Sequence, residues 1–273
     1  MPANSEKPIP NVLTIAGSDS GGCAGIQADL RAFSAQGLHG LSVITAVTAQ
    51  NTTQVASIHR VPAREVARQL EALFADFRIG AIKIGMLGSA TTMRVVTDFL
   101  RARAIRNIVI DPLLLSTSGA ALYPRRALAR LRAELLPLAT LLTPNVPEGE
   151  ALLGRRIRRA DELPQAARDL LEIGARAVLL KGGHLRGSPV CDVLVDARTT
   201  WKFTHPRLSV SVRGTGCALS AAIAAALARG LELEAAVRCG EKYLQDGLRG
   251  AYRPGRSNRH ALGKATPRIA NES

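Results

Sequence analysis

The stretch with the clearest chemical signature is Arg213-Gly214-Thr215-Gly216-Cys217, which runs directly into the apolar sequence ALSAAIAAALA. Two glycines and a small hydroxyl residue at the start of an alanine-rich helix leave several backbone N–H groups without helical partners. Such a helix start binds anions through its amides and its dipole. A thiol in the first helical turn is expected to have a lowered pKa. We therefore predict an anion site beside Cys217; a tight turn with a packed thiol is the alternative.

A second glycine-rich segment, GSDSGGCAG at residues 17–25, follows the first apolar run of the chain. It lacks the Gly-Lys-Ser/Thr ending of a Walker loop, and it lacks the Gly-x-Gly-x-x-Gly dinucleotide fingerprint. Its glycines fit a backbone that closes over a small ligand, with Asp19 and Asp29 as polar contacts. This motif taken alone is weak.

Polar residues also follow most of the later apolar runs. They are Gln50, Gly85-Met86, Asp111, Asn145 with Glu148, and Lys181-Gly182-Gly183-His184. Ligands of open α/β sheets bind at the carboxyl ends of the strands. Each residue alone is more simply a turn residue, but their recurrence favours a single polar crevice.

The elements that must position these residues alternate along the chain. Short runs of β-branched and apolar residues predict strands at 12–16, 41–47, 55–61, 81–84, 107–110, 140–143 and 177–180. Residues 192–211 have the pattern of antiparallel strands. Apolar residues at helical spacing predict the intervening helices, which are 24–36, one starting at Pro62, 90–103, 124–136, 147–153, 161–173, 215–229 and 234–248. This order predicts an α/β fold with a mostly parallel sheet covered by helices on both faces.

The chain reads as one domain over residues 11–250, with a flexible segment at 1–10 and a basic, disordered tail at 251–273. The net charge is +14, and six of the 36 cationic residues are lysines, so 30 are arginines. These arginines are dispersed and aromatic residues make up only 3%, which argues against nucleic-acid binding. The four cysteines form no Cys-x-x-Cys pair, so neither a zinc site nor a disulfide framework is expected.

No apolar run reaches the length of about 18 residues that spans a membrane. The N-terminal residues MPANSEKPIP have no apolar core, so we expect a cytoplasmic protein without a secretory signal.

Seven motifs occur in a specific order. They are TIAGSDSGGCAGIQADL, VITAVTAQN, KIGML, VIDP, LLTPNVPE, LLKGGH and RGTGCALSAAIAAALA. Together, over residues 11–248, they resemble the hydroxymethylpyrimidine/phosphomethylpyrimidine kinases of thiamine biosynthesis. The resemblance implies a ribokinase-like α/β/α fold of three layers with little or no lid. It also implies a homodimer that uses ATP and Mg²⁺.

The implied reaction is phosphorylation of 4-amino-5-hydroxymethyl-2-methylpyrimidine by ATP, followed by phosphorylation of the monophosphate. A pyridoxal or hydroxymethylpyrimidine salvage kinase is the alternative within this chemistry, because both substrates carry a 5-hydroxymethyl group on an aromatic ring. A non-catalytic paralogue that binds pyrimidine or nucleotide is the alternative from another class.

The resemblance also assigns roles to individual positions. The substrate pocket would contain Asp29, Gln50, Met86 and Leu113, together with Gly17 and Asp19. The phosphates of ATP and the magnesium ion would be held by Asp111, Asn145 and Glu148, with Asp111 and Glu148 as metal ligands and Lys181 offsetting charge. Gly214, Thr215 and Gly216 would form the anion hole, and Cys217 would act as the base.

Several positions depart from the family pattern. Cys23 and Ala120 replace a usual Gly and Asp, Arg213 replaces a usual His, and Ala218 replaces a usual Thr. The residues before the anion hole, SVSV, lack the usual Asn-Thr. No core catalytic position is lost, but the changes leave room for altered substrate choice or weaker catalysis.

Overall fold

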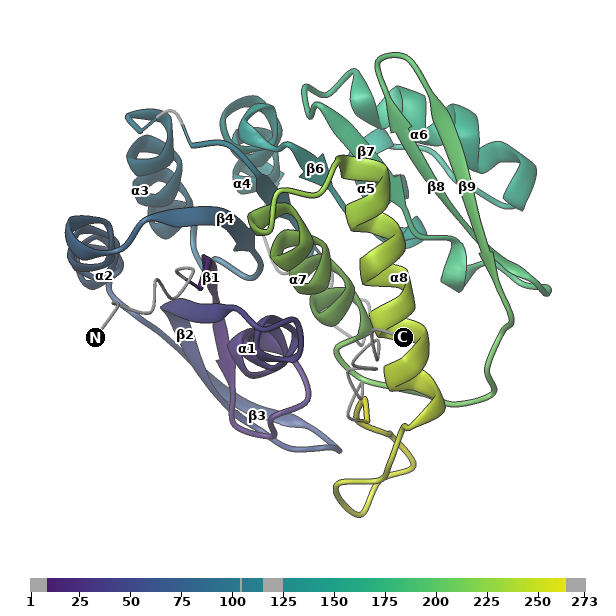
Figure 1. Cartoon of the computed structure of the whole chain (residues 1–273), viewed down its shortest axis with the longest axis horizontal. Helices are drawn as coiled ribbons and strands as arrows, with labels where there is room; N and C mark the ends of the chain where they lie inside the picture. Colours follow the sequence, from purple (N-terminus) through teal and green to yellow (C-terminus); the bar gives the residue numbers. More distant parts are fainter. Residues whose placement is uncertain (1–8, 104, 115–124, 264–273) are drawn as a thin grey trace, which may run out of the picture.

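The structure is a computed structural model that describes residues 9–103, 105–114 and 125–263 (Figure 1). Most of the segment expected to be flexible at the N-terminus, the departure Ala120 and the end of the basic tail lie outside these ranges. None of the helices in the described ranges is long and apolar enough to cross a membrane.

In the part of the chain that the structure describes, one sheet of nine strands has the order β3-β2-β1-β4-β5-β6-β7-β8-β9. The bounds are β1 Asn11–Asp19, β2 His39–Gln50, β3 Val55–Arg60, β4 Ile79–Ile84, β5 Ile108–Ile110, β6 Leu141–Leu142, β7 Ala177–Leu180, β8 Val190–Asp196 and β9 Thr200–His205. The six neighbouring strands β2, β1, β4, β5, β6 and β7 pair in parallel. At the two edges of the sheet, β3 pairs antiparallel with β2, β8 with β7, and β9 with β8. The predicted mostly parallel sheet is thus confirmed.

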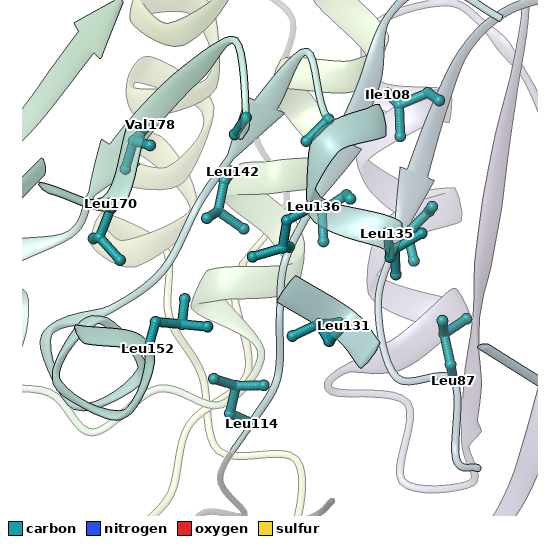
Figure 2. Packing of buried hydrophobic residues seen from close by; sticks show 14 of the residues in the cluster. Leu87, Ile108, Leu114, Leu131, Leu135, Leu136, Leu142, Leu152, Leu170 and Val178 are labelled. Atoms are coloured by element: carbon teal, nitrogen blue, oxygen red, sulfur yellow. The ribbon is translucent and has the colours of Figure 1, made fainter. Parts of the chain in front are cut away.

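Helices cover both faces of this sheet, because successive residues of a buried strand point to opposite sides. On one face Val12, Ala81 and Val109 pack against three helices, which are α1 Gly25–Ala35, α7 Thr215–Ala228 and α8 Leu233–Arg249. On the other face Leu13 and Ile82 belong to a larger cluster, part of which is seen in Figure 2. The helices packed there include α2 Ala63–Asp76, α3 Ala90–Arg101 and α6 Leu163–Leu171. The chain therefore has the three layers expected.

The remaining helices on the second face are short. They are α4 Arg125–Arg130 and α5 Val146–Leu153. The helix predicted over 124–136 is interrupted within its described part. A π-helical turn spans Leu131–Leu135, and a 3-10 turn follows over Leu136–Leu138. Pro137 lies within that last turn and lacks the N–H that a continuing α-helix needs.

Helix α7 lies in the middle of the molecule beside β1, β4 and α8 (Figure 1). Every residue from Cys217 to Leu227 is buried, which explains why the helix has no polar face. Its alanines permit close packing, and so does Gly240 of α8: a Cβ at this glycine would lie 2.5 Å from Cγ1 of Ile223. These contacts hold the middle of α7 close against α8.

The structure differs from the sequence prediction at two points near that start. Strand β1 continues through Gly17 to Asp19, where we expected a turn after residue 16. Residues 251–263, which we expected in a disordered tail, return to the domain. His260 exchanges backbone hydrogen bonds with Ser211 and Arg213, and Tyr252 pairs with Ala261. These backbone hydrogen bonds join segments that are far apart in the sequence. The local composition of residues 251–263 therefore could not predict them.

Candidate functional site

A cavity of about 450 Å³ lies at the carboxyl ends of β1, β2 and β4, the edge of the sheet at which α/β proteins bind ligands. Its lining is drawn from segments far apart in the sequence. It comprises Ala16, Gly17, Ser18, Asp19, Ala24, Gly25, Thr48, Gln50, Thr53, Gln54, Val55, Ile58, Lys83, Met86, Leu113, Arg213, Cys217 and Arg259. Most of the exposed lining is apolar, which suits a small ring with a few polar substituents.

Asp19 shapes the loop at one wall of this cavity. Its Oδ1 accepts a hydrogen bond from the amide of Gly21 at 2.8 Å, and its Oδ2 accepts from the amides of Cys23 and Ala24 at 3.1 and 2.9 Å. Ala24 is the N-cap of α1 and has no capping side chain of its own. The carboxylate of Asp19 therefore holds the turn into α1, a positioning role in addition to its place on the cavity wall.

Two glycines bring the starts of α1 and α7 together. Gly25 has a φ of +57°, and a Cβ there would lie 2.3 Å from the carbonyl oxygen of Gly17. Gly214 has a φ of +76°, and a Cβ there would lie 2.0 Å from the carbonyl oxygen of Cys23. Any side chain at either position would meet both strain and backbone overlap. Close backbone approach thus explains why glycine occupies both loops.

Asp29 does not line the cavity, contrary to its predicted place in the substrate pocket. Its side chain is wholly buried in the first layer beneath the lining, where Oδ2 accepts hydrogen bonds from Lys83 Nζ at 2.8 Å and from Thr14 Oγ1 at 2.6 Å. Burial acts to lower the pKa of Lys83, but the charges of Asp29, Cys217 and Asp111 together with the Asp29 hydrogen bond outweigh burial and raise that pKa above its ordinary value. Asp29 thus holds a charged Lys83 at the cavity.

Cys217 lies in the first turn of α7 and lines the same cavity, as predicted. Its pKa, however, is not lowered. Burial of the thiol raises it to about 11, and the charges of Asp111 and Asp29 add to this, while Lys83 lowers it. Desolvation disfavours the thiolate more than the helix start favours it. In this structure the thiol keeps its proton at neutral pH.

A second, acidic part of the site lies on the other side of the α7 start. Asp111 follows β5 and its Oδ1 accepts from Lys181 Nζ at 3.2 Å. A Cβ on Gly216 would lie 3.2 Å from that Nζ and 3.4 Å from Asp111 Oδ2. The predicted phosphate lysine, the predicted metal ligand and the predicted anion hole are therefore in direct proximity.

Asn145 and Glu148 come from the capping box at the start of α5. Asn145 Oδ1 accepts from the amide of Glu148 at 3.0 Å, and Glu148 Oε2 accepts from the amide of Asn145 at 2.9 Å. Burial raises the pKa of Glu148, with Asp111 adding to the shift and Lys181 opposing it. Asp111, Glu148 and Lys181 therefore interact electrostatically, and the single positive charge of Lys181 faces two carboxylates.

This acidic group fits a magnesium ion by its chemistry. Oδ2 of Asp111 is buried without a hydrogen-bond partner among the described residues, and carboxylate oxygens are the ligands that Mg²⁺ prefers. One lysine between Asp111 and Glu148 leaves an excess negative charge that a divalent cation would balance. Both residues predicted as metal ligands are thus suited to that role.

The predicted residues therefore divide into two groups that meet at the start of α7. Gly17, Asp19, Gln50, Met86, Leu113 and Cys217 line the cavity. Asp111, Asn145, Glu148 and Lys181 lie in the acidic group. Leu113 has a φ of +41°, a strained backbone conformation for a leucine, and such strain is concentrated at functional sites.

Sequence reasoning missed two cationic residues of the cavity and gave a third only a tentative role. Lys83 stands within the apolar strand sequence IGAIKI, and a lone lysine in a buried strand is a signal that could have identified it. Arg259 comes from the segment expected to be disordered, so no sequence signal was available. Arg213, noted only as a family departure, also lines the cavity.

The fold and the site together define a small-molecule kinase related to pyridoxal kinases. A solved ADP complex of Bacillus subtilis pyridoxal kinase superposes with a TM-score of 0.89 and 28% identity, covering 96% of this chain and all of that one. Phosphomethylpyrimidine kinase from Clostridium difficile superposes with a TM-score of 0.79 and 39% identity over 88% of this chain and 99% of that one.

The sequence profile of phosphomethylpyrimidine kinase matches residues 19–261, and the chain belongs to this family. A hydroxymethylpyrimidine/phosphomethylpyrimidine kinase of Rhizobium meliloti is 46% identical over 88% of this chain and 91% of its own length. A bifunctional thiamine biosynthesis protein of Geobacter sulfurreducens is 45% identical over 93% of this chain, which spans about half (53%) of that longer protein.

Proposed function

We propose that the protein transfers phosphate from ATP to 4-amino-5-hydroxymethyl-2-methylpyrimidine, and then to the resulting monophosphate, in thiamine biosynthesis. The observation that carries this proposal is the position of the α7 start. Cys217 lines the apolar cavity, and Gly216 in the same turn is adjacent to Asp111 and Lys181. A hydroxymethyl group at Cys217 would therefore lie next to the anion-binding amides and the charged groups suited to a nucleotide.

The cavity suits an aminopyrimidine. The carboxamide of Gln50 can both donate and accept, as the edge of such a ring requires. Met86 and Leu113 supply apolar contacts, and Met86 Cε fills the space that a side chain on Gly17 would need. We assign Asp29 an indirect role through Lys83 rather than a substrate contact.

Phosphoryl transfer depends mainly on positioning and on neutralising charge. We assign the binding of Mg²⁺ to Asp111 and Glu148, where the ion would neutralise charge on the ATP phosphates. Lys181 and the amides of residues 214–217 would stabilise the transferring group. In the first step the thiolate form of Cys217, present once the thiol has released its own proton to solvent, would take the proton of the hydroxymethyl group.

The second step has a phosphate as acceptor, and the cavity carries additional positive charge for it. The guanidinium groups of Arg213 and Arg259 both line the cavity, and guanidinium groups suit phosphate oxygens. Arg213 is tethered to the loop after β2 through the carbonyl oxygen of Asn51, at 3.3 Å. We propose that these two arginines bind the monophosphate.

A magnesium–ATP turnover assay tests the proposal. The hydroxymethylpyrimidine, its monophosphate and pyridoxal are offered separately, and the products are resolved by mass. We expect both mono- and diphosphate from the pyrimidine. Turnover of pyridoxal alone would instead establish a vitamin salvage kinase, the second candidate that the likeness to the Bacillus subtilis pyridoxal kinase structure favours. Binding without turnover would establish a non-catalytic pyrimidine-binding protein.

We also propose a homodimer, acting in the cytoplasm where ATP is available. Strand β3 is an edge of the sheet, and all six of its residues are exposed. Val55 and Ile58 of this strand, which also line the mouth of the cavity, are large apolar side chains, 47% and 43% exposed. An exposed apolar edge favours association with a second copy. Light scattering on the wild type and on Ile58→Lys tests this, with a dimer expected only for the former.

A further inference from the structure

A second group of buried ionisable side chains lies away from the proposed active site, where β8, β9 and α8 meet. It consists of Asp192, His205 and Glu241, whose ligand atoms all lie within 4.8 Å of one another. His205 Nε2 is 3.6 Å from Asp192 Oδ2 and 3.9 Å from Glu241 Oε2. These distances are too long for hydrogen bonds and leave space between the three groups.

The fold directs these side chains toward one another. In the β8–β9 ladder Val190 pairs with His205 and Asp192 pairs with Phe203, so Asp192 and His205 are diagonal neighbours on one face. Helix α8 covers that face, because the guanidinium of Arg238 lies 5.2 Å from the ring centre of Phe203. Glu241 is one turn further along the helix and so points to the same place.

Within the described residues, the polar side-chain atoms of Glu241 and His205 have no hydrogen-bond partner, whereas Asp192 accepts one hydrogen bond through Oδ1. Both carboxylate oxygens of Glu241 and both ring nitrogens of His205 are buried without a hydrogen bond. Gln245, a turn beyond Glu241, also has both amide atoms buried and unpartnered. Glu241 is 7% exposed, and no lysine or arginine in the described ranges forms an ion pair with it or with Asp192. Buried carboxylates without a cation are costly.

From this geometry we propose that Asp192, His205 and Glu241 bind a divalent transition-metal ion of the zinc class. One imidazole and two carboxylates balance the charge of such an ion and match the nitrogen and oxygen ligands it takes. Tetrahedral ligands at zinc are about 3.4 Å apart. The observed separations reach that value through small side-chain rotations. The amide oxygen of Gln245 or a water molecule supplies the fourth ligand.

The ion would hold three segments together, and it would be linked to the active site through the backbone at Gly182 and through the charge of Lys181, which Glu241 senses. The other carboxylate oxygen of Asp192, Oδ1, accepts a hydrogen bond from the amide of Gly182 at 2.7 Å. Gly182 directly follows Lys181, and a Cβ there would lie 2.1 Å from the carbonyl oxygen of Cys191. The metal site would therefore fix the turn that carries Lys181. It is separate from the proposed magnesium ligands Asp111 and Glu148.

A proton is the alternative occupant of the cluster. Burial and the adjacent carboxylate of Asp192 raise the pKa of Glu241, and a protonated Glu241 could donate to Asp192. The two occupants make opposite predictions. If a proton suffices, replacing Glu241 by glutamine leaves the cluster satisfied and metal has no effect. If a metal ion is bound, the same substitution removes a ligand.

Zinc binding to the full, chelator-treated chain tests the proposal, with excess Mg²⁺ present to saturate carboxylate sites of the hard-ion type. Calorimetric titration and elemental analysis are expected to give one zinc per chain, and zinc is expected to raise the Tm. His205→Gln and Glu241→Gln should each weaken zinc binding by more than about tenfold. The exposed controls His59→Gln and Glu71→Gln should bind as the wild type does. Equal zinc affinity in all five proteins would overturn the proposal.

Cobalt substitution of the wild type keeps the test decisive even if a variant does not fold. Visible bands of four-coordinate Co²⁺ without a thiolate-to-cobalt absorption would support the nitrogen and oxygen ligands. A thiolate band would place the ion at a cysteine, and the absence of any cobalt or zinc binding would leave a proton as the occupant. Either of these two results would contradict the proposal.

Discussion

Lys83 and Lys181 each pair with a buried aspartate near the start of α7, and the two pairs differ in their charge balance. Lys83 and Asp29 are 2.8 Å apart, both side chains are fully buried, and their charges cancel. Lys181 and Asp111 are 3.2 Å apart, and Lys181 is 12% exposed. Glu148 adds a second carboxylate to this lysine. Each aspartate keeps one oxygen without a partner, so charge balance is the feature that separates them.

This comparison teaches that a buried ion pair can serve either the fold or a ligand. The balanced pair supports the cavity from beneath, and its two charges cancel within the protein. The unbalanced group is complete only when a cation is added. We therefore expect substitutions in the first to change stability most, and substitutions in the second to change activity most.

The largest effect is expected for Asp111→Asn. The substitution keeps the shape of the side chain but removes charge from the proposed magnesium site, so kcat for both steps should fall by about 10³. The free energy of unfolding should change by less than about 1 kcal/mol, because one carboxylate still faces Lys181. Steady-state kinetics and urea unfolding measure the two quantities. The exposed Asp98→Asn is the control, and a large loss of stability in Asp111→Asn would contradict the comparison.

Lys83→Met is expected to produce the converse result. It leaves Asp29 charged and buried, which costs about 3–5 kcal/mol of unfolding free energy. The double variant Lys83→Met/Asp29→Leu removes both charges and should recover much of this loss. Urea unfolding of the single and double variants measures the coupling. Additive losses would show that the pair is not the stabilising unit.

Cys217→Ala should separate the two reactions. An alcohol gains from a base, whereas an ionised phosphate does not, so the first phosphorylation should fall by about 10² and the second by much less. Separate rate measurements on the two acceptors, with Cys239→Ala as the control, provide the test. An equal loss of rate in both steps would contradict the assignment of Cys217 as the base and would leave it a positioning role.

The pH dependence of the wild type sharpens this assignment. Burial raises the pKa of Cys217 to about 11. Below this pKa, each rise of one pH unit increases the thiolate fraction about tenfold. The first step should therefore accelerate between pH 7 and 9. The second step should stay nearly constant there, since its phosphate acceptor has a second pKa of about 6. Parallel profiles for the two steps would rule out the thiolate as the base.

Arg259→Ala should have the smallest effect. Loss of one partly exposed guanidinium from the cavity should raise KM for the monophosphate about fivefold, which corresponds to about 1 kcal/mol. KM for the unphosphorylated pyrimidine should not change. Arg256→Ala, an exposed neighbour in the same segment, is the control. An equal change in KM for both substrates would remove Arg259 from phosphate binding.

The sequence predicted the fold closely, because its signals are local. The run AVLL at residues 177–180 forms β7 with the bounds expected, and the alanine-rich helix begins at Thr215 as its glycines indicated. The acidic group was also found, since Asp111 and Asn145 follow apolar strands that end at one edge of the sheet.

What the sequence could not reveal depends on burial and on distant partners. The pKa of Cys217 is set by desolvation, which no motif reports. The burial of Asp29 depends on Lys83, which is 54 positions away in the chain. The sequence analysis expected no zinc site because it examined cysteine spacing, whereas the proposed ligands Asp192, His205 and Glu241 meet only through the β8–β9 ladder and α8.

The central position of α7 also has a consequence for synthesis. Strands β1 and β4 leave the ribosome early, but the helix that covers them begins only at Thr215. Until about residue 230 has emerged, α1 is the only one of the three covering helices that is available to the apolar face formed by Val12 and Ala81. Proteins are made at about 5–20 residues per second, so this face waits for roughly ten seconds or more. We therefore expect the nascent chain to expose this face while the remaining elements are made, and its active site to be completed last.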